Sequence, residues 1–373
     1  MSLSAGLYVH IPFCGVKCFY CDFTAFAGQG GTVNRYLSAL GIEAALMPER
    51  DPVTLYVGGG TPSELDEEQI RRLFALISGA YPRSRFQELT FEANPESLSP
   101  AKIAALRDNG VSRLSLGLQT FDDALLKSIG RRHSAADFLE VYAAARRAGN
   151  WALSVDLMYG LPGQTLESCL RSLDGVLALE PEHLSLYGLQ VEDRTLFGKR
   201  EVEPDESLAR DMFEASLERL ERNGYRHYEI SNFARPGYES AHNQLYWRDD
   251  EYIGLGCGAA SYLDGERSSN MDRLPSYCQA VEAGRRPVAH SERLSGKEKL
   301  GERAMLGLRL VRGFAPGREI EQAFRDEWES LAGRGLIQRE GDRVSLTREG
   351  IFMANQAFAE FVPPFRQPGA VAQ

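Results

Sequence analysis

The sequence predicts an α/β protein built on a parallel sheet, because strand-like and helix-like segments alternate six times along the first 224 residues. The strand-like runs are apolar, β-branched or aromatic, and several mix apolar and small residues on both faces, as strands covered on both sides do. They span residues 7–13, 54–60, 88–94, 113–119, 152–160 and 183–190. Right-handed crossovers would join them into either an open doubly wound sheet or an incomplete barrel, and the periodicity leaves both open.

The helical segments between these runs carry recognisable start and stop signals. Amphipathic patterns cover 34–46, 66–81 and 137–149, and a further helix is expected near 206–224. Ser99-Pro100 is typical of an N-cap and first helical residue, and Asn109-Gly110 of a C-terminal stop.

The chain of 373 residues is long enough for more than one domain. We expect the barrel or sheet domain over 1–224 and a β-rich extension over 225–290, where short strands alternate with turns and few helical signals occur. A small C-terminal domain over 291–373 is expected to end in a helix, a hairpin turn at Glu340-Gly341-Asp342 and a final helix, which resembles a winged-helix layout.

The charge balance disfavours nucleic acid as a partner. The net charge is −10, the pI is near 5.3 and no run of Lys or Arg stands out, so the winged-helix-like section is interpreted as packing rather than DNA binding. No window approaches about 18 apolar residues, and the opening MSLSAGLYVHIPF lacks a basic leader region. Six cysteines without an export signal suggest a reducing compartment, and we expect the protein in the cytoplasm.

Polar or glycine-rich positions follow the strand-like runs. Since the carboxyl ends of parallel strands share one edge, we expect these residues to line a single cavity there. They are Gly59, Gly60 and Thr61 after the second run, and Glu92, Asn94, Gln119, Asp156 and Gln190 at or near the ends of the next four.

Three cysteines in the stretch HIPFCGVKCFYCDF follow the first strand-like run directly. Cys14, Cys18 and Cys21 form a C-x₃-C-x₂-C triplet with no fourth cysteine beside them. Structural zinc needs four ligands, usually in two separated pairs, although His10 would be a candidate fourth ligand. Three thiolates instead suit an iron–sulfur cube with one iron left open to an external ligand.

This triplet, with an aromatic residue (Tyr20) before the third cysteine, resembles the signature of the radical S-adenosylmethionine (SAM) superfamily. The resemblance implies a partial (β/α)₆ TIM-like barrel and a [4Fe-4S] cluster held by Cys14, Cys18 and Cys21. It also implies that the open iron is chelated by the methionine moiety of SAM, whose sulfonium bond is split by an electron from the cluster.

A narrower resemblance is to the coproporphyrinogen III oxidase-like group, whose strings YVHIPFC, GGGTPS, FEANPE, LSLGLQTF, GRRH and VDLMYGLPGQT occur here in order. It implies that Tyr8 and Tyr20 lie near the adenosyl moiety of SAM, and that Gly59, Gly60 and Thr61 lie along its amino group and ribose. Glu92, Gln119 and Asp156 would meet other polar groups of SAM, and Arg131 would meet its carboxylate. Gln190 is a weaker match.

Within this group the oxidases carry an N-terminal extension and a further cysteine two positions after the third. This sequence begins its first strand-like run at residue 7 and has Phe23 at that position, as in the HemW type, whose members are regarded as heme chaperones. The string HNQLYW (242–247) also matches that type. It would offer His242 as an axial heme ligand and Tyr246 and Trp247 as flat apolar surface.

The function expected is therefore a heme chaperone that delivers heme to apo-hemoproteins, for which the family suggests respiratory-chain proteins at the inner membrane. A homodimer gated by the cluster or SAM is a further hypothesis. An oxygen-independent coproporphyrinogen III oxidase and a structural zinc protein are the alternatives, and oxidase activity is disfavoured.

Overall fold

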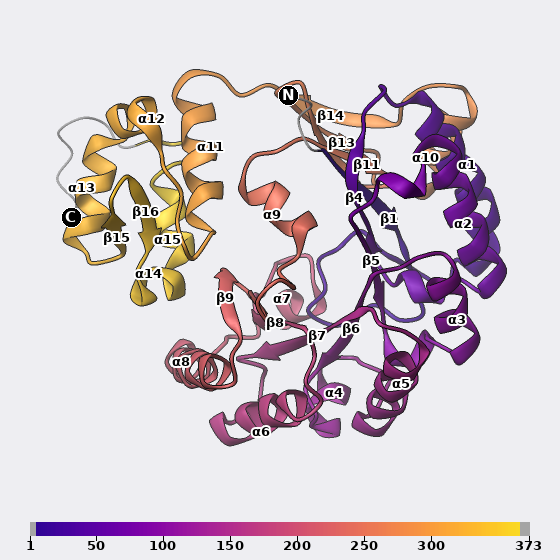
Figure 1. The fold of residues 1–373 in the computed structure, drawn as a ribbon, viewed down its shortest axis with the longest axis horizontal. Coiled ribbons are helices and arrows are strands. Elements are labelled where there is room, and N and C mark those ends of the chain that lie inside the picture. The colour runs from indigo at the N-terminus through magenta and orange to yellow at the C-terminus, as the bar shows by residue number, and fades with distance from the viewer. Residues whose placement is uncertain (1–4, 366–373) are drawn as a thin grey trace.

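The computed structural model describes residues 5–365, and one sheet of 12 strands runs through its centre (Figure 1). Six parallel strands pair in chain order with helices between them, so the predicted α/β fold with an incomplete (β/α)₆ barrel is confirmed. These strands are β1 (Ala5–Ile11), β4 (Pro52–Gly59), β5 (Glu88–Ala93), β6 (Arg113–Gln119), β7 (Ala152–Tyr159) and β8 (His183–Gly188).

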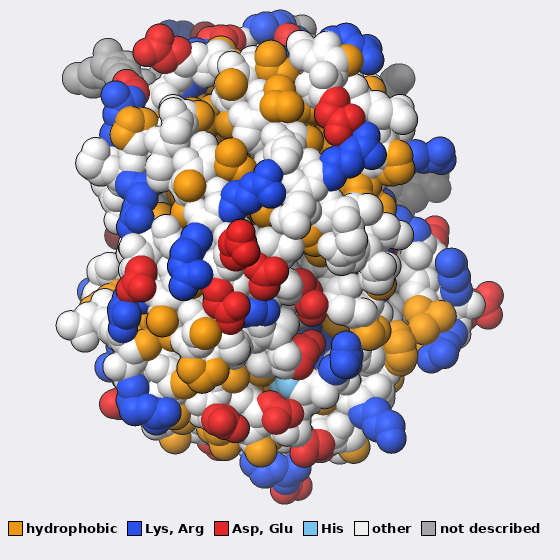
Figure 2. Space-filling model, turned by 90° about the vertical axis from the view of Figure 1, so that its right-hand side faces the viewer, with side chains coloured by type: hydrophobic (Ala, Val, Ile, Leu, Met, Phe, Trp, Pro, Cys, Tyr) orange, Lys and Arg blue, Asp and Glu red, His pale blue; other side chains and the backbone are white. Residues whose placement is uncertain are grey.

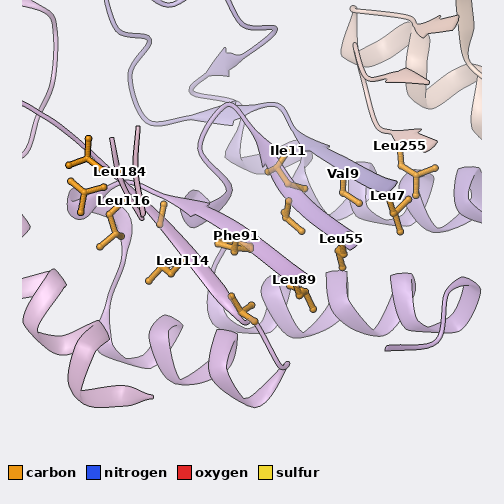
Figure 3. Packing of buried hydrophobic residues seen from close by; sticks show 14 of the residues in the cluster. Leu7, Val9, Ile11, Leu55, Leu89, Phe91, Leu114, Leu116, Leu184 and Leu255 are labelled. Atoms are coloured by element: carbon orange, nitrogen blue, oxygen red, sulfur yellow. The ribbon is translucent and has the colours of Figure 1, made fainter. Parts of the chain in front are cut away.

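Helices follow these strands, and most of them cover the outer face of the barrel. They are α1 (Val33–Leu46), α2 (Glu67–Ala80), α3 (Pro100–Asp108), α4 (Asp123–Ser128), α5 (Ala135–Ala148), α6 (Leu166–Leu177), α7 (Leu196–Lys199) and α8 (Glu206–Arg222). The short α7 instead packs against the cysteine loop, where the Phe197 amide donates to the Phe19 carbonyl. The predicted signals of α3 are confirmed, because the Ser99 side chain accepts a hydrogen bond from the Lys102 amide and Gly110 takes a positive φ of 73°. Apolar side chains such as Leu7, Val9 and Ile11 form the core between the strands and this helix layer (Figure 3).

Residues 225–290 extend both edges of the sheet. At one edge β10 (Asn232–Ala234) pairs with β8 and β9 (Arg226–Glu229) with β10, both antiparallel. At the other edge β11 (Tyr252–Leu255) lies parallel to β1, and β12 (Ala260–Leu263), β13 (Glu266–Asn270) and β14 (Val288–Glu292) follow antiparallel. The chain thus crosses from one edge of the sheet to the other, and the boundaries expected at 224 and 290 stay a prediction.

This region also contains two helices, α9 (Ala241–Trp247) and α10 (Leu274–Glu282), where few helical signals were expected. The start of α9 is fixed by two side chains. Ser240 caps it by accepting from the Asn243 amide, and the buried Glu88 carboxylate accepts from the first N–H groups of the helix, where an anion is favoured. The carboxylate comes from β5, far away in the sequence, so a local pattern does not reveal it.

The C-terminal section packs as a separate group of helices around a hairpin (Figure 1). The predicted turn at Glu340-Gly341-Asp342 is confirmed, since Glu340 pairs with Arg343 across it. The elements are α11 (Gly296–Leu308), α12 (Gly317–Ala323), α13 (Arg325–Gly333), β15 (Ile337–Glu340), β16 (Arg343–Leu346), α14 (Arg348–Phe352) and α15 (Ala354–Ala359). A short strand pair, β2 (Phe13–Cys14) and β3 (Phe26–Ala27), frames the cysteine loop.

The surface carries mixed charge on the face shown in Figure 2, where basic and acidic side chains are interspersed with apolar atoms. Among residues 5–365, no helix combines the length and apolar character needed to cross a bilayer. The expectation that the opening stretch is not a leader falls partly on residues 1–4, outside the described part of the chain.

Candidate functional site

One cavity of about 970 Å³ at the carboxyl ends of the barrel strands gathers most of the predicted site residues. The three cysteines are unpaired and partly buried, and they share this cavity with the strand-end residues. The predicted residues that line it are Cys14, Cys18, Tyr20, Cys21, Gly59, Gly60, Thr61, Glu92, Gln119, Arg131, Asp156 and Gln190. Tyr8 and His242 do not line it.

The glycine-rich turn after β4 supports the cysteine loop directly. The amide of Gly60 donates to the carbonyl of Ile11 at 2.9 Å, and the amide of Thr61 donates to that of Phe13 at 2.8 Å. The Thr61 hydroxyl lies 3.4 Å from Sγ of Cys14. A Cβ at position 60 would stand 2.8 Å from the Phe13 oxygen and 3.1 Å from Cys14 Sγ, so only glycine permits this approach.

The donor set of the loop suits an iron–sulfur cube, because three thiolates leave one iron open to an external ligand. In residues 5–365, no three His, Cys, Asp or Glu side chains come together closely enough to hold one metal ion. Burial raises the pKa of the Cys14 thiol to about 11, so binding of iron would have to displace its proton.

Two half-buried carboxyl groups line the cavity at the barrel mouth. Glu92 on β5 accepts hydrogen bonds from the Tyr56 hydroxyl at 2.6 Å and the Gly59 amide at 3.2 Å. Burial nevertheless raises the pKa of Glu92 to about 7. Burial likewise raises the pKa of Asp156 on β7 to about 6, although Ser115 donates to it at 3.3 Å. Such a pair would be stabilised in its ionised form by a cationic ligand.

Arg131 supplies a positive charge to the cavity beside the cysteine loop. Its Nη2 donates to Asn94 Oδ1 at 2.7 Å and to the carbonyl of Gly117 at 2.6 Å, and its Nη1 lies 3.7 Å from Cys18 Sγ. Its buried Nε has no hydrogen-bond partner among the described residues. An unpaired N–H of a buried guanidinium beside the cysteine loop is suited to an anionic group of a ligand.

Gln119 ends β6 in a strained conformation. Its φ is 72°, in the left-handed region that non-glycine residues rarely adopt, and it is almost fully buried. A Cβ at Gly117 would stand within 3.1 Å of the Gln119 amide nitrogen, Arg131 Nη2 and Asn94 Oδ1. These three polar groups therefore meet at one point of the cavity wall. Backbone strain such as that of Gln119 is often found in binding sites.

Tyr8 and His242 lie on the other side of this wall. Tyr8 lines a neighbouring cavity of about 580 Å³ with Tyr246 and Trp247. His242 is fully buried; its Nδ1 is hydrogen bonded to the Thr54 hydroxyl at 2.7 Å and its Nε2 to the Tyr246 hydroxyl at 2.8 Å. Axial ligation of heme iron by His242 would require one of these two hydrogen bonds to break, since an imidazole binds a metal through a single ring nitrogen, and that role stays a prediction.

Several residues of the site were not predicted as such. Tyr56 precedes the glycine-rich turn, and its alternation with buried Leu55 and Val57 already places it on the inner face of β4. Asn94, by contrast, was expected at this edge of the sheet and lines the cavity, but the sequence does not reveal its partner Arg131. The far end of the cavity is lined by Arg309 and by residues 351–356 and 358 of the C-terminal section, for which no local sequence signal exists.

Comparison with known proteins agrees with this geometry. The radical SAM superfamily model matches residues 8–174, and the HemN C-terminal domain model matches residues 294–353. The heme chaperone HemW of Bacillus subtilis is 38% identical, covering 95% of this chain and 98% of the relative, and that of Escherichia coli is 39% identical, covering 96% and 98%. The solved structure of the Escherichia coli coproporphyrinogen III oxidase HemN, a radical SAM enzyme, superposes with a TM-score of 0.83 at 26% identity, covering 97% of this chain and 91% of that one.

A (β/α)₆ barrel whose mouth presents three loop cysteines beside half-buried carboxyl groups and an arginine defines a radical SAM protein. Within that class, the 38% and 39% identity to HemW proteins over nearly the whole chain shows the family. The chain belongs to the HemW family.

Proposed function

We propose that the protein is a heme chaperone that binds heme together with a [4Fe-4S] cluster and SAM, and transfers heme to apo-hemoproteins. The observation that carries this proposal is the similarity to heme chaperones over nearly the whole chain, including the C-terminal section. The 970 Å³ cavity supports it, because that volume extends well beyond the cysteine loop to the C-terminal helices.

The cluster would be held by Cys14, Cys18 and Cys21, and together cluster and SAM would supply one-electron chemistry at this site. Thr61 steadies the Cys14 thiol, and the backbone of the glycine-rich turn fixes the start of the loop. The protein's part is thus to keep three thiols partly shielded from water while leaving one side of the cluster open to the cavity.

SAM carries a carboxylate and two cationic groups, which match the charges lining the cavity. Arg131 would pair with the carboxylate through its guanidinium, since this residue lines the cavity. Glu92 and Asp156 would lie toward the cationic groups, and Gln119 would hydrogen bond to the ligand. Carbonyl oxygens at Gly59 and Gly60, with Thr61, would accept from the amino group, while Tyr20 and Gln190 would border the adenosyl end.

Tyr8 and His242 would act through their neighbours. Tyr56 stacks obliquely between them, with ring centroids 6.1 Å from Tyr8 and 5.2 Å from His242, and it is Tyr56 that donates to Glu92. We therefore assign His242 a positioning role in the free protein. Axial ligation by His242 would need a rearranged α9.

The second candidate function is coproporphyrinogen III oxidation, which the HemN superposition favours because the cofactor site would be common to both. Phe23 argues against it. This residue stands where the oxidases carry a further cysteine, and its side chain is 67% exposed and lines the cavity with an apolar ring instead of a thiol.

The recipients we propose are respiratory-chain hemoproteins at the inner membrane, approached from the cytoplasm. The cluster-gated homodimer is supported by two exposed apolar side chains that flank the cysteines, Val16 at 46% and Phe23 at 67% exposure. Apolar residues in this position are suited to a partner surface that forms only when the loop is ordered by its cluster.

Anaerobic reconstitution followed by parallel hemin titration and a porphyrinogen decarboxylation assay tests the proposal. We expect about four irons per chain, as a cubane requires, saturable hemin binding and transfer of heme to an apo-cytochrome, without porphyrinogen consumption. Decarboxylation with reduced protein and SAM would instead support the oxidase.

A further inference from the structure

Two half-buried arginines line the cavity, and the SAM assignment uses only one of them. Arg131 stands beside the cysteine loop, whereas Arg309 follows the end of α11 at the side formed by the C-terminal section. Both guanidinium groups have a buried Nε without a hydrogen-bond partner among the described residues. The same unsatisfied donor therefore occurs twice in one cavity.

Arg309 is held in place by aromatic rings rather than by an anion. Its guanidinium carbon lies 4.2 Å from the centroid of Trp247 and 5.5 Å from that of Phe358. Glu229 attracts it, but the Glu229 carboxylate already accepts from the Ser231 amide and the Asn232 side chain. Burial lowers the pKa of Arg309, which reflects the cost of a charge without a close counter-ion.

The walls around Arg309 are largely apolar. Phe213 from α8, Ile230 from the β9–β10 turn, and Phe352, Met353 and Phe358 from the C-terminal helices line this part of the cavity. A ligand that fits here needs an extended apolar body and at least one anionic group. The apolar lining favours burial of apolar ligand surface, and the Arg309 guanidinium has no close counter-ion among the described residues.

We infer that this compartment is the heme subsite, in which the porphyrin lies against the C-terminal helices and one propionate pairs with Arg309. The inference rests on the proposed heme-chaperone function and deepens it. Heme has the required shape and charge, since its ring is flat and apolar and its two propionates are anionic.

This placement also gives the HNQLYW segment a physical role. His242 and Tyr246 are hydrogen bonded to each other within α9, and Trp247 at the end of the same helix stacks on Arg309. Helix α11, which Arg309 follows, contacts both α9 and α15 (Figure 1). The segment thus positions the guanidinium that receives the propionate, and His242 need not touch the iron.

The test compares hemin with hemin dimethyl ester, whose propionates are neutral, on the reconstituted full-length protein. Wild-type protein should prefer hemin by at least about thirtyfold, as expected for a buried charge pair, and Arg309→Gln should remove that preference without weakening the ester. Arg309→Lys should retain most of it, and Arg318→Gln, an exposed arginine on α12, should behave as wild type.

A preference for hemin that survives in Arg309→Gln would overturn the inference and leave the proposed function intact. Wild-type protein that binds neither compound would overturn the proposed function itself. If Arg309→Gln fails to fold, exposed Asn355 provides an independent test, since it also lines the cavity. Asn355→Asp should weaken the binding of hemin several-fold without weakening the binding of the ester, whereas Asn150→Asp on the surface should change neither affinity. An unchanged ratio of the hemin and ester affinities in Asn355→Asp would count against the inference.

Discussion

The hydroxyl of Tyr56 donates a hydrogen bond of 2.6 Å to Oε1 of Glu92, joining adjacent strands inside the barrel mouth. This contact partly offsets the cost of burying the carboxylate. It also connects the cofactor side of the site to His242, whose ring centroid lies 5.2 Å from that of Tyr56. Because the Glu92, Tyr56 and His242 side chains contact one another in series, the site should be sensitive to the loss of any one of them.

Removing the donor should weaken SAM binding. Tyr56→Phe leaves Glu92 with one fewer hydrogen bond, so its pKa should rise further and its ionised form should become scarcer at neutral pH. We expect SAM affinity to fall about tenfold, the effect of one hydrogen bond to a charged group, measured by calorimetry on the reconstituted protein. Tyr238→Phe, at an exposed tyrosine, is the matched control, and equal affinities in the two variants would contradict the role given to Tyr56.

Binding of SAM should also strengthen as the pH rises. The pKa values of Glu92 and Asp156 are about 7 and about 6, so both groups are largely neutral below pH 6 and ionised above pH 7. A cationic ligand prefers the ionised forms, and affinity should fall up to about tenfold per pH unit below this window for each carboxyl group that must ionise. Glu92→Gln should flatten the upper part of the profile.

The unliganded protein should show the opposite trend in stability. The pKa values of both carboxyl groups in the folded state lie above their ordinary values of 4.5 and 3.8. The folded form therefore holds more protons than the unfolded form between pH 4 and 7. Their contribution to the free energy of unfolding therefore decreases as the pH rises through that range. Glu92→Gln should reduce this slope in urea titrations, and an unchanged slope would argue that Glu92 is not buried.

Gly60→Ala should impair assembly of the cluster. The added Cβ would stand 2.8 Å from the Phe13 carbonyl and 3.1 Å from Cys14 Sγ, so the cysteine loop must shift. We expect iron content after reconstitution to drop by at least half while the helical circular dichroism persists. Gly79→Ala in α2, where a Cβ meets nothing within 4 Å, should keep full iron content.

His242→Ala separates positioning from ligation. Loss of the imidazole leaves the Thr54 and Tyr246 hydroxyls without their buried partner, and we expect a destabilisation of about 2–4 kcal/mol. The heme Soret band should keep its position if His242 is not an axial ligand. A shifted band with retained stability would favour ligation instead, and His290→Ala, at an exposed histidine, supplies the baseline.

Phe23→Ser should prevent cluster-dependent dimerisation. The side chain is 67% exposed beside Cys21, and its replacement removes apolar area without touching a buried group. We expect the reconstituted variant to elute as a monomer in anaerobic size exclusion, with wild-type iron content. Leu139→Ser removes a comparable exposed apolar side chain from α5 and should leave the elution unchanged.

The local parts of this architecture could be predicted from sequence, and the long-range parts could not. The six barrel strands follow from apolar runs, and the cysteine loop from a tight spacing that has few chemical explanations. The pairing of β11 with β1, the Glu88 cap on α9 and the cation–π contact of Arg309 with Trp247 each join segments distant in the chain. No periodicity records such contacts, because they depend on how the elements pack.

His242 illustrates the same limit within the site. Its sequence motif indicated a functional role, but the partner that engages its Nδ1, Thr54, lies 188 residues away on β4. Tyr8 was likewise expected at the cofactor, whereas its hydroxyl is hydrogen bonded to His10 and it lines the neighbouring cavity. Tyr8 lies on β1 and His242 lies on α9, where it packs against β4, and the orientation of both side chains is set by neighbours that the sequence alone does not place.

The position of β1 between β4 and β11 has a consequence for how the protein matures. The strand that leads into the cysteine loop is made before both of its neighbours, and the second of them follows some 250 residues later. The last wall of the cavity comes from residues 351–358, which are made later still. Iron and sulfide should therefore be loaded only after the C-terminal section has been made, when all walls of the cavity are present.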